Sequence, residues 1–487
     1  MSRGKPILVL SVVSEIFPLI KTGGLGDVTG ALPMAVAEHG VKITTLVPGY
    51  PSVVAALQDV RAVLDVDDLF GGVARVLAGR AAGHDLLVID APHLFDREGN
   101  PYLDPDGRDW PDNAFRFGAL SLIAARIGLG EVAEFRPNIV HCHDWQAGLT
   151  LAYLAYDGRP RPATIFTIHN LAYQGLFPAP LMSALRLPAA ALQIDGVEYY
   201  GQIGFMKAAL LFADRITTVS PTYAAEMQTP TNGFGLDGLL RARADTITGI
   251  TNGIDTKVWN PLRDKHIPAT FGRTTLSKRK TNKAQLQRRF ELDGDADSLV
   301  FGVVSRLAPQ KGLDMLADAM PVLLGTGAQL AVLGSGDLPL ERRMSALAAA
   351  RPGRVGCIIG YNEELAHLVQ AGADSVLVPS RYEPCGLTQL CALHYGAIPL
   401  VAKVGGLADT VIDPERAEPG SDSANGIQFS PVTQEALEGA ILRIAAIWAD
   451  KKRWERMQVN GMRTDVSWKK SGALYAALYA QALAARN

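Results

Sequence analysis

Short apolar runs alternate with segments of helical periodicity, and the pattern begins a second time after residue 298. This alternation predicts parallel strands joined by crossover helices. We therefore expect α/β units with open, doubly wound parallel sheets, whose ligand-binding loops lie at the carboxyl ends of the strands. The expected strands span residues 7–13, 41–47, 86–89, 138–141 and 164–168 in the first half, and 299–304, 329–333, 355–359, 375–378 and 398–401 in the second.

The two sets of strands predict two domains, which suits a chain of 487 residues. Between them, residues 259–283 are polar and irregular, with Pro261, Pro268 and a basic cluster, as is typical of a linker. We expect the first domain at residues 1–259 and the second at residues 260–466. The helical pattern of residues 467–487 follows the second sheet and is expected to cross back to the first domain.

Charge and cysteine content exclude several classes of protein. The 47 Lys and Arg residues nearly balance the 49 Asp and Glu residues, so no strong field would attract nucleic acid or an anionic membrane. The four cysteines show no paired framework and no C-x-x-C spacing, which favours a reducing cytoplasm. The apolar start is followed at once by Glu15 and a glycine-rich loop, without a cleavage site, and is expected to be a strand and not a signal peptide.

The loop at residues 21–28 follows the first strand and opens a helix. Gly23 and Gly24 would let backbone N–H groups approach an anion, and Lys21 adds a full charge, so phosphate is the expected ligand. The alternative is a tight strand-to-helix turn with a solvated lysine. The glycine spacing differs from G-x-G-x-x-G, which argues against a dinucleotide oxidoreductase.

The segment His141-Cys142-His143-Asp144-Trp145 resembles a metal cluster in composition only. Strand alternation places the histidines on one face and the cysteine and aspartate on the other, so one ion would not collect all four. At the ligand edge of the sheet, Asp144 and Trp145 are expected to contact sugar. A buried tryptophan after a helix-capping aspartate remains the alternative.

Three further polar side chains follow expected strands. His169 can donate or accept a hydrogen bond near a reacting sugar, although a lone histidine at such a place is more often structural. Arg306 and Lys311 occupy the loop after the first strand of the second domain, where they can converge on a diphosphate. The alternative for these two cations is a solvated basic turn.

The loop Glu383-Pro384-Cys385-Gly386-Leu387-Thr388 lies between an expected strand and a helix. The helix start offers the N–H groups of Leu387 and Thr388 to an anion, while Glu383 faces neutral hydroxyl groups. One loop would thus bind both halves of a nucleotide sugar. We expect Cys385 to pack or to contact substrate and not to act as a nucleophile.

Seven motifs together resemble those of bacterial glycogen synthases and plant starch synthases. This resemblance implies a GT-B fold, in which two Rossmann-like domains face each other across a deep cleft. It also implies a retaining glucosyltransferase that needs no metal or cofactor and moves glucose from ADP-glucose to the non-reducing-end 4-hydroxyl of an α-1,4-glucan such as glycogen. The motifs are KTGGLGDV at 21–28, HDW at 143–145, HN at 169–170, NGID at 252–255, SRL at 305–307, QKG at 310–312 and EPCGL at 383–387.

The resemblance also implies roles for individual residues. Arg306 and Lys311 would neutralise the diphosphate, helped by the backbone of residues 386–388 and by the loop of Gly23 and Gly24. Lys21 would lie at the sugar and phosphate, and Glu383 would hold the glucose 3- and 4-hydroxyls. The remaining roles are His169 and Asn252 at the C6 side of the glucose, Cys385 at the donor, Tyr361 against adenine, and Asp144 with Trp145 at the acceptor.

Three other functions compete with this interpretation. Other GT-B transferases commonly carry a second glutamate seven residues after the first, where this chain has Leu390. An α-glucan phosphorylase would need a pyridoxal lysine site, which we do not identify. A glucan-binding scaffold without activity is disfavoured by the intact Lys21, Lys311 and Glu383.

Overall fold

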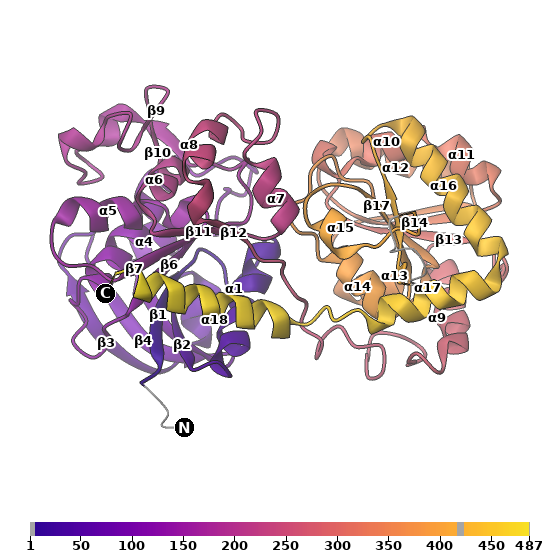
Figure 1. The fold of residues 1–487 in the computed structure, drawn as a ribbon, viewed down its shortest axis with the longest axis horizontal. Coiled ribbons are helices and arrows are strands. Elements are labelled where there is room, and N and C mark those ends of the chain that lie inside the picture. The colour runs from indigo at the N-terminus through magenta and orange to yellow at the C-terminus, as the bar shows by residue number, and fades with distance from the viewer. Residues whose placement is uncertain (1–4, 416–422, 487) are drawn as a thin grey trace. The chain divides into compact units, whose positions relative to one another are not determined.

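The computed structural model describes residues 5–415 and 423–486, which form two compact units (Figure 1). The first unit comprises Met1–Asn252 and Trp468–Asn487, and the second comprises Gly253–Ser467. Residues 253–259, expected in the first domain, thus belong to the second unit. The outermost residues of the expected first domain, 1–4 and 487, and residues 416–422 of the second lie outside the described part of the chain.

The first unit is built on a nine-stranded sheet in the order β12-β11-β7-β6-β1-β2-β5-β4-β3. All neighbours from β12 to β5 are parallel, as the strand pattern predicts, whereas β4 is antiparallel to both β5 and β3. The strand pattern does not predict β3, because β3 is an edge strand that is largely exposed and lacks an apolar run. The strands are β1 Ile7–Val12, β2 Val41–Pro48, β3 Gln58–Val66, β4 Ala74–Ala81, β5 His84–Asp90, β6 Ile139–His143, β7 Ala163–Ile168, β11 Arg215–Thr218 and β12 Ile247–Gly249.

Helices cover this sheet, and a small antiparallel sheet, β8-β10-β9, lies outside it. The glycine-rich loop opens α1, as expected. The elements are α1 Gly24–Ala37, α2 Pro51–Ala56, α3 Pro92–Phe95, α4 Asn113–Gly128, α5 Leu149–Asp157, α6 Phe205–Phe212, α7 Pro221–Glu226, α8 Asp237–Ala242, β8 Leu176–Pro178, β9 Glu198–Tyr199 and β10 Gln202–Gly204, with 3-10 turns at Trp145–Ala147, Ala179–Leu181, Ala189–Ala191 and Ala244–Thr246.

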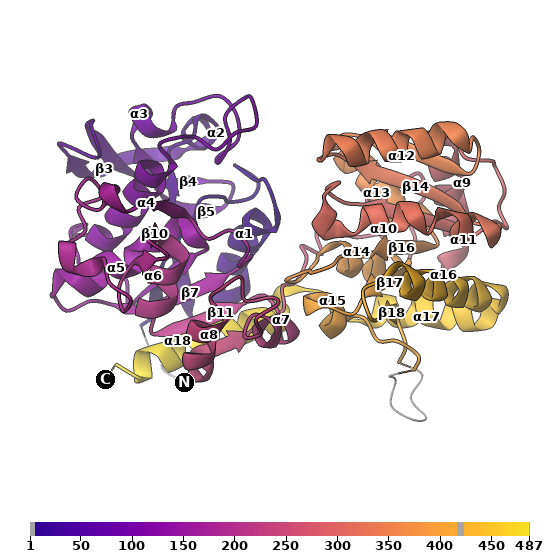
Figure 2. The same ribbon diagram turned by 90° about the horizontal axis from the view of Figure 1, so that it is seen from above.

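The last helix, α18 (Trp468–Ala484), packs beside α1 (Figure 1) and runs along one side of the first unit (Figure 2). Its Tyr475, Leu478 and Tyr479 are buried in the cluster that also holds Val9 of β1 and Ile165 of β7. The Tyr479 hydroxyl lies 2.9 Å from Nδ1 of His141. This packing places the C-terminal helix in the core of the first unit.

The second unit is built on a six-stranded parallel sheet in the order β15-β14-β13-β16-β17-β18. Alternate residues of one strand enter different cores, since Phe301 and Val303 pack on one face of the sheet and Val300 on the other. Helices therefore cover both faces. The strands are β13 Val300–Val304, β14 Gln329–Gly334, β15 Val355–Ile359, β16 Ser375–Val378, β17 Ile398–Ala402 and β18 Ile427–Phe429.

The helices of the second unit follow the crossover pattern that the sequence predicts. None of the described helices of the chain is both long and apolar enough to cross a bilayer. The helices are α9 Arg279–Arg289, α10 Leu313–Asp318, α11 Met320–Gly325, α12 Leu338–Ala350, α13 Glu363–Gly372, α14 Thr388–Tyr395, α15 Gly405–Thr410, α16 Gln434–Ala449 and α17 Lys451–Arg463, with 3-10 turns at Leu276–Lys278 and Pro309–Lys311.

Candidate functional site

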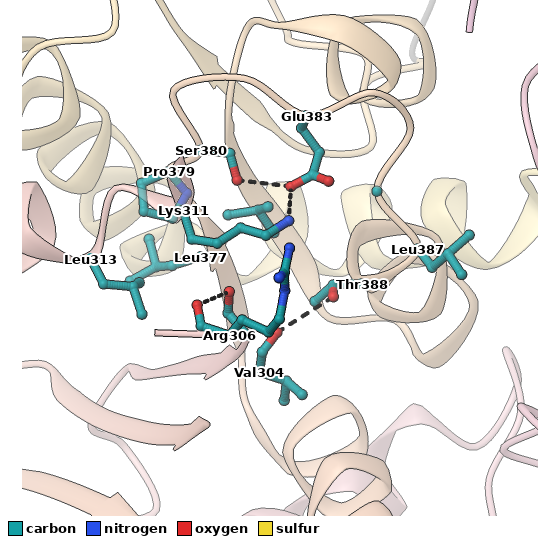
Figure 3. Close-up of a pocket in the computed structure, with 13 residues that line it drawn as sticks. Val304, Arg306, Lys311, Leu313, Leu377, Pro379, Ser380, Glu383, Leu387 and Thr388 are labelled. Atoms are coloured by element: carbon teal, nitrogen blue, oxygen red, sulfur yellow. Dashed lines mark hydrogen bonds and ion pairs between the residues drawn. The ribbon is translucent and has the colours of Figure 1, made fainter. Parts of the chain in front are cut away.

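A pocket of about 170 Å³ lies at the carboxyl ends of β13 and β16 in the second unit (Figure 3). The loops after these two strands and the start of α14 form its walls. The pocket brings together six of the residues expected to bind the donor, namely Arg306, Lys311, Glu383, Gly386, Leu387 and Thr388.

The charged centre of the pocket is an ion pair between Lys311 and Glu383. Lys311 Nζ donates to Glu383 Oε2 at 2.6 Å, and Ser380 Oγ donates to the same oxygen at 2.9 Å. Both charged side chains are largely buried. No described residue donates to the second carboxylate oxygen of Glu383, so this oxygen can accept from another donor, such as a ligand hydroxyl.

Arg306 adds a second cation to the pocket. Figure 3 shows its side chain beside that of Lys311, with both pointing toward Glu383. Hydrogen bonds tie the two loops together: among them, the Arg381 N–H donates to the Gln310 carbonyl, and Gln310 Nε2 donates to the Tyr382 carbonyl. The loops therefore hold both cations at one place, as recognition of a diphosphate requires.

The start of α14 supplies backbone donors at the wall of the pocket. Among the described residues no side chain caps this helix at Leu387, so none of them satisfies its first N–H groups as a cap. Gly386 has a φ of 71°, and a Cβ there would lie 2.5 Å from Gln389 Oε1, so only glycine fits this turn. An anion at this helix start would contact the first N–H groups of α14 as well as the side chains of Arg306 and Lys311.

In the second unit, two other residues that we expect to bind the nucleotide sugar, Cys385 and Tyr361, do not line the pocket. Cys385 is buried, as expected of a packing residue. Tyr361 follows β15 and is 80% exposed, and its hydroxyl donates to the Glu363 carboxylate. The Tyr361 side chain is thus largely accessible to solvent.

In the first unit, the glycine-rich loop at the start of α1 is organised by Glu15, which the sequence analysis did not single out. The Glu15 side chain is buried and accepts hydrogen bonds from the N–H groups of Thr22 and Gly23, from Thr22 Oγ1 at 2.6 Å and from the Tyr102 hydroxyl. The loop therefore binds an internal carboxylate through two of its N–H groups. Lys21 is half-exposed and pairs with Asp27 at 2.8 Å.

Asp144 joins the loops that follow β6 and β7. Its Oδ1 accepts from the N–H groups of His169 at 2.7 Å and Asn170 at 3.3 Å, so it does not cap the turn that follows it. Burial raises the pKa of Asp144 to about 7, although the two N–H groups oppose this shift. The capping alternative for Asp144 is therefore wrong.

Trp145 lies among aromatic side chains. Its ring centroid is 4.9 Å from that of Phe117 and 5.8 Å from that of Phe177. Trp145 is only half-buried, so one part of the indole packs in the unit and another part faces solvent. This placement agrees with the packing alternative and leaves an exposed edge for a ligand.

His169 is held by another histidine, His143. His143 Nδ1 and His169 Nε2 are 3.0 Å apart, so one of the two nitrogens donates to the other. Burial lowers the pKa of His169 to about 3 and that of His143 well below its usual value, so both rings are neutral at pH 7. Asn252 is also buried, and its Oδ1 has no hydrogen-bond partner among the described residues.

Three residues that organise these loops were not predicted from the sequence: Glu15, His143 as the partner of His169, and Ser380. Glu15 and Ser380 follow the ends of strands, which is the one signal that points to them. Their partners are distant in the sequence or in the next loop, and no local pattern reveals them. Among the described residues, no group of three or more His, Cys, Asp or Glu side chains has an arrangement suited to a metal ion.

Comparison with protein families gives two matches that together span most of the chain. Residues 8–242 match the starch synthase catalytic domain, and residues 285–461 match the glycosyl transferases group 1 family. The two matches fall in the two units described above. The motif pattern of both units is therefore that of glycosyltransferases.

Individual relatives agree over the full length. The chain is 57% identical to a glycogen synthase from Rhodopseudomonas palustris (strain BisA53) and 54% identical to glycogen synthase 2 from Bradyrhizobium diazoefficiens, with 99% of each chain covered in both cases. It is similar to the solved catalytic domain of starch synthase IV from Arabidopsis thaliana, bound to ADP and acarbose. That structure is 29% identical, has a TM-score of 0.88, and is matched over 99% of this chain and 100% of the neighbour.

These findings confirm the expected fold class, with two Rossmann-like α/β units of the GT-B type. The expected resemblance is confirmed as well, since curated relatives align from end to end. The chain belongs to the family of bacterial glycogen synthases and plant starch synthases.

Proposed function

We propose that this protein is a retaining glucosyltransferase that extends an α-1,4-glucan, glycogen in particular, with glucose from ADP-glucose. The observation that carries the proposal is the pocket in which Lys311, Arg306 and the start of α14 surround Glu383. Full-length relatives that bear the name glycogen synthase support the polymer, and a structural neighbour bound to ADP supports the base of the donor.

On the donor side, Lys311 and Arg306 neutralise the diphosphate, together with the N–H groups of Leu387 and Thr388 at the start of α14. Glu383 accepts hydrogen bonds from the glucose 3- and 4-hydroxyls through its oxygen atoms. The exposed ring of Tyr361 stacks on the adenine, and Gly386 and the buried Cys385 shape the turn between these contacts.

The residues of the first unit serve the sugar and the acceptor. Lys21 with Gly23 and Gly24 approaches the sugar and phosphate, and His169 and Asn252 approach the C6 side of the glucose. Asp144 and the exposed edge of Trp145 position the acceptor. Because His169 is neutral at pH 7, it acts through hydrogen bonds and not through charge.

The reaction separates charge, since positive charge develops at glucose C1 and negative charge on the departing ADP. The bond between C1 and the acceptor O4 forms as the bond between C1 and the phosphate oxygen breaks, on the same face of the sugar. The proton of the acceptor hydroxyl passes to a phosphate oxygen of ADP. This route retains the α configuration without a protein nucleophile, and Lys311 and Arg306 stabilise the charge on the leaving group.

We also propose that the enzyme acts in the cytoplasm and needs no metal or cofactor. Among the described residues the four cysteines form no disulfide, and Cys142, Cys385 and Cys391 are buried, which agrees with a reducing compartment.

The test is the release of ADP from ADP-glucose by the full chain, with and without glycogen, and with UDP-glucose in a parallel reaction. We expect release that depends on glycogen and is faster with ADP-glucose. Glycogen-independent hydrolysis, or no release from ADP-glucose at all, would contradict the proposed function.

A further inference from the structure

A buried side chain of α14, Gln389, holds the backbone of the loop that forms one wall of the pocket in the second unit. Its Nε2 donates to the carbonyl oxygens of Cys385 at 3.0 Å and Gly386 at 2.9 Å. Two carbonyl partners require the nitrogen of the amide, and not its oxygen, at this position. Gln389 has no exposed surface and does not line the pocket, so both carbonyl groups are directed toward a buried side chain.

The direction of these carbonyl groups fixes the direction of two N–H groups. Both peptides are trans, and in a trans peptide the N–H points opposite to the C=O. The carbonyl of Cys385 shares a peptide with the N–H of Gly386, and the carbonyl of Gly386 shares one with the N–H of Leu387. Among the described residues, neither N–H has a hydrogen-bond acceptor. Gln389 thus directs both N–H groups away from itself, where Gly386 and Leu387 line the pocket.

The amide of Gln389 is itself held by α15. Its Nε2 also donates to Thr410 Oγ1 at 3.1 Å, and this hydroxyl donates to the carbonyl of Gly406 at 2.6 Å. The Gly406 N–H in turn donates to the carbonyls of Glu383 at 3.2 Å and Pro384 at 3.1 Å. Four consecutive carbonyl groups of the loop are therefore bonded to α14 or α15, and the loop has little freedom to rotate its peptides.

A buried glutamine that bonds carbonyl groups is not by itself a sign of function. Gln329, the first residue of β14, is also buried, and its Nε2 donates to the carbonyl of Asp293 at 2.9 Å. It lies at the amino end of its strand, at the sheet edge opposite the pocket. Gln389 differs because the peptides that it holds present N–H groups to a pocket that also contains Arg306 and Lys311.

We propose that Gln389 is a positioning residue for glucosyl transfer, which aims the N–H groups of Gly386 and Leu387 at the phosphate that departs with ADP. The inference rests on the proposed function, which supplies a diphosphate leaving group. N–H groups that are already aimed at the place where negative charge develops stabilise this charge without reorganisation during the reaction. Without the amide of Gln389, the two peptides would be free to turn their N–H groups away.

The charge on this phosphate separates the proposed role from general support of the pocket. In ADP-glucose the phosphate bonded to glucose carries one negative charge, and it gains further charge as its bond to glucose C1 breaks. Aimed N–H groups therefore stabilise the transition state and bound ADP more than bound ADP-glucose. Loss of the aim should lower kcat and weaken the binding of ADP, with a smaller effect on the binding of ADP-glucose.

The test uses Gln389→Met in the full chain, because methionine has a similar length and shape but no amide. The matched control is Gln329→Met, which removes the same buried amide at the opposite edge of the same sheet. For each protein we would measure kcat with glycogen, and the dissociation constants for ADP and for ADP-glucose without glucan by calorimetry. Thermal unfolding reports whether each variant is folded.

We expect Gln389→Met to lower kcat and to raise the dissociation constant for ADP, each on the order of tenfold. The dissociation constant for ADP-glucose should rise by about twofold or less. Gln329→Met should match the wild type in all three quantities. A folded Gln389→Met variant that matches this control would overturn the proposal. So would equal weakening of ADP and ADP-glucose, which would show a general distortion of the pocket.

A second variant, Thr410→Val, tests the same arrangement with a smaller change. Valine keeps the shape of the side chain and removes only the hydroxyl that accepts from Gln389. We expect kcat to fall by about threefold, on the scale of one hydrogen bond, with ADP again weakened more than ADP-glucose. If Gln389→Met did not fold, unchanged kinetics and ADP binding in Thr410→Val would overturn the proposal.

The binding measurements also separate this proposal from the proposed function. If the wild type bound ADP but transferred no glucose to glycogen, the proposed activity would fail, whereas weaker ADP binding in Gln389→Met would still support the aim of the N–H groups. If the wild type were active and Gln389→Met matched its control, the positioning role of Gln389 alone would be refuted.

Discussion

At the scale of single residues, Lys311 has an internal partner that a ligand would replace. Its Nζ is held by Glu383 Oε2, which also accepts from Ser380. A diphosphate carries more negative charge than one carboxylate and would draw the lysine away from Glu383. Glu383 would then have oxygen atoms available for sugar hydroxyls, so binding of the phosphates and binding of the sugar are linked through one ion pair.

Removal of either cation tests this account. We expect Lys311→Ala and Arg306→Ala each to lower kcat on the order of a hundredfold or more, because their charge meets charge that develops on the leaving group. The affinity for ADP-glucose without glucan, measured by calorimetry, should change much less, because the leaving-group charge has not yet developed in that complex. Arg343→Ala is the control, since Arg343 of α12 lies outside the pocket and pairs with Asp318. A kcat near that of the wild type in either pocket variant would contradict the role of the cations.

The carboxylate can be tested by itself with Glu383→Gln. The amide keeps the size of the side chain but loses the charge that holds Lys311. We expect kcat to fall by on the order of a hundredfold, whereas ADP should bind as tightly as to the wild type or more tightly. Weaker ADP binding would show that Glu383 holds Lys311 in place for the ligand and does not compete with the ADP phosphates for Lys311. Ser380→Ala, which removes one hydrogen bond to Glu383, should give a smaller loss of kcat.

At the scale of elements, a column of three buried histidines, His141, His143 and His169, connects β6, the end of β7 and α18. His141 bonds Tyr479 of α18 through Nδ1 and Thr167 of β7 through Nε2, at 2.9 and 2.6 Å, and its ring centroid is 4.1 Å from that of His143. His143 in turn bonds His169. The C-terminal helix is thus connected to an expected site residue through side chains within one unit.

This column makes the first unit sensitive to acid. Burial lowers the pKa of both His141 and His169 to about 3, whereas an unfolded histidine titrates at about 6.5. Between about pH 3 and pH 6.5 the unfolded chain binds more protons than the folded chain. The contribution of the neutral histidines to the free energy of unfolding is therefore complete above about pH 6.5 and is lost as the pH falls. Asp144 opposes this trend, because its pKa of about 7 makes the folded state the stronger proton binder between about pH 4 and 7.

We expect a fall from pH 7.5 to 5 to cost about 2 kcal/mol of unfolding free energy for each of these two histidines. In His141→Gln the thermal midpoint of the first unit should therefore fall less steeply with decreasing pH. His39→Gln, a change at an exposed histidine of the same unit, is the control. An equally steep fall in His141→Gln and the wild type would show that His141 is not the neutral group that the buried column implies.

At the scale of the whole molecule, the apolar pattern was enough to predict five strands of each parallel sheet, the return of the last helix, and the strand ends that carry Arg306 and Glu383. The antiparallel β3 and β4, the parallel strands β11, β12 and β18, and the three short strands β8, β9 and β10 were missed, because they are short or carry no apolar run long enough to be recognised. Long-range partners were missed as well. Glu15 meets Tyr102, and His141 meets Tyr479, only after the chain has folded, so no local spacing could reveal these contacts.

The most direct test of the account is a crystal structure of the full chain with ADP. We predict that the diphosphate lies at the start of α14, with Lys311 Nζ and the Arg306 guanidinium within hydrogen-bonding distance of its oxygens, and with Lys311 released from Glu383. A nucleotide bound elsewhere, or one at this pocket with both cations directed away from its phosphates, would contradict the account.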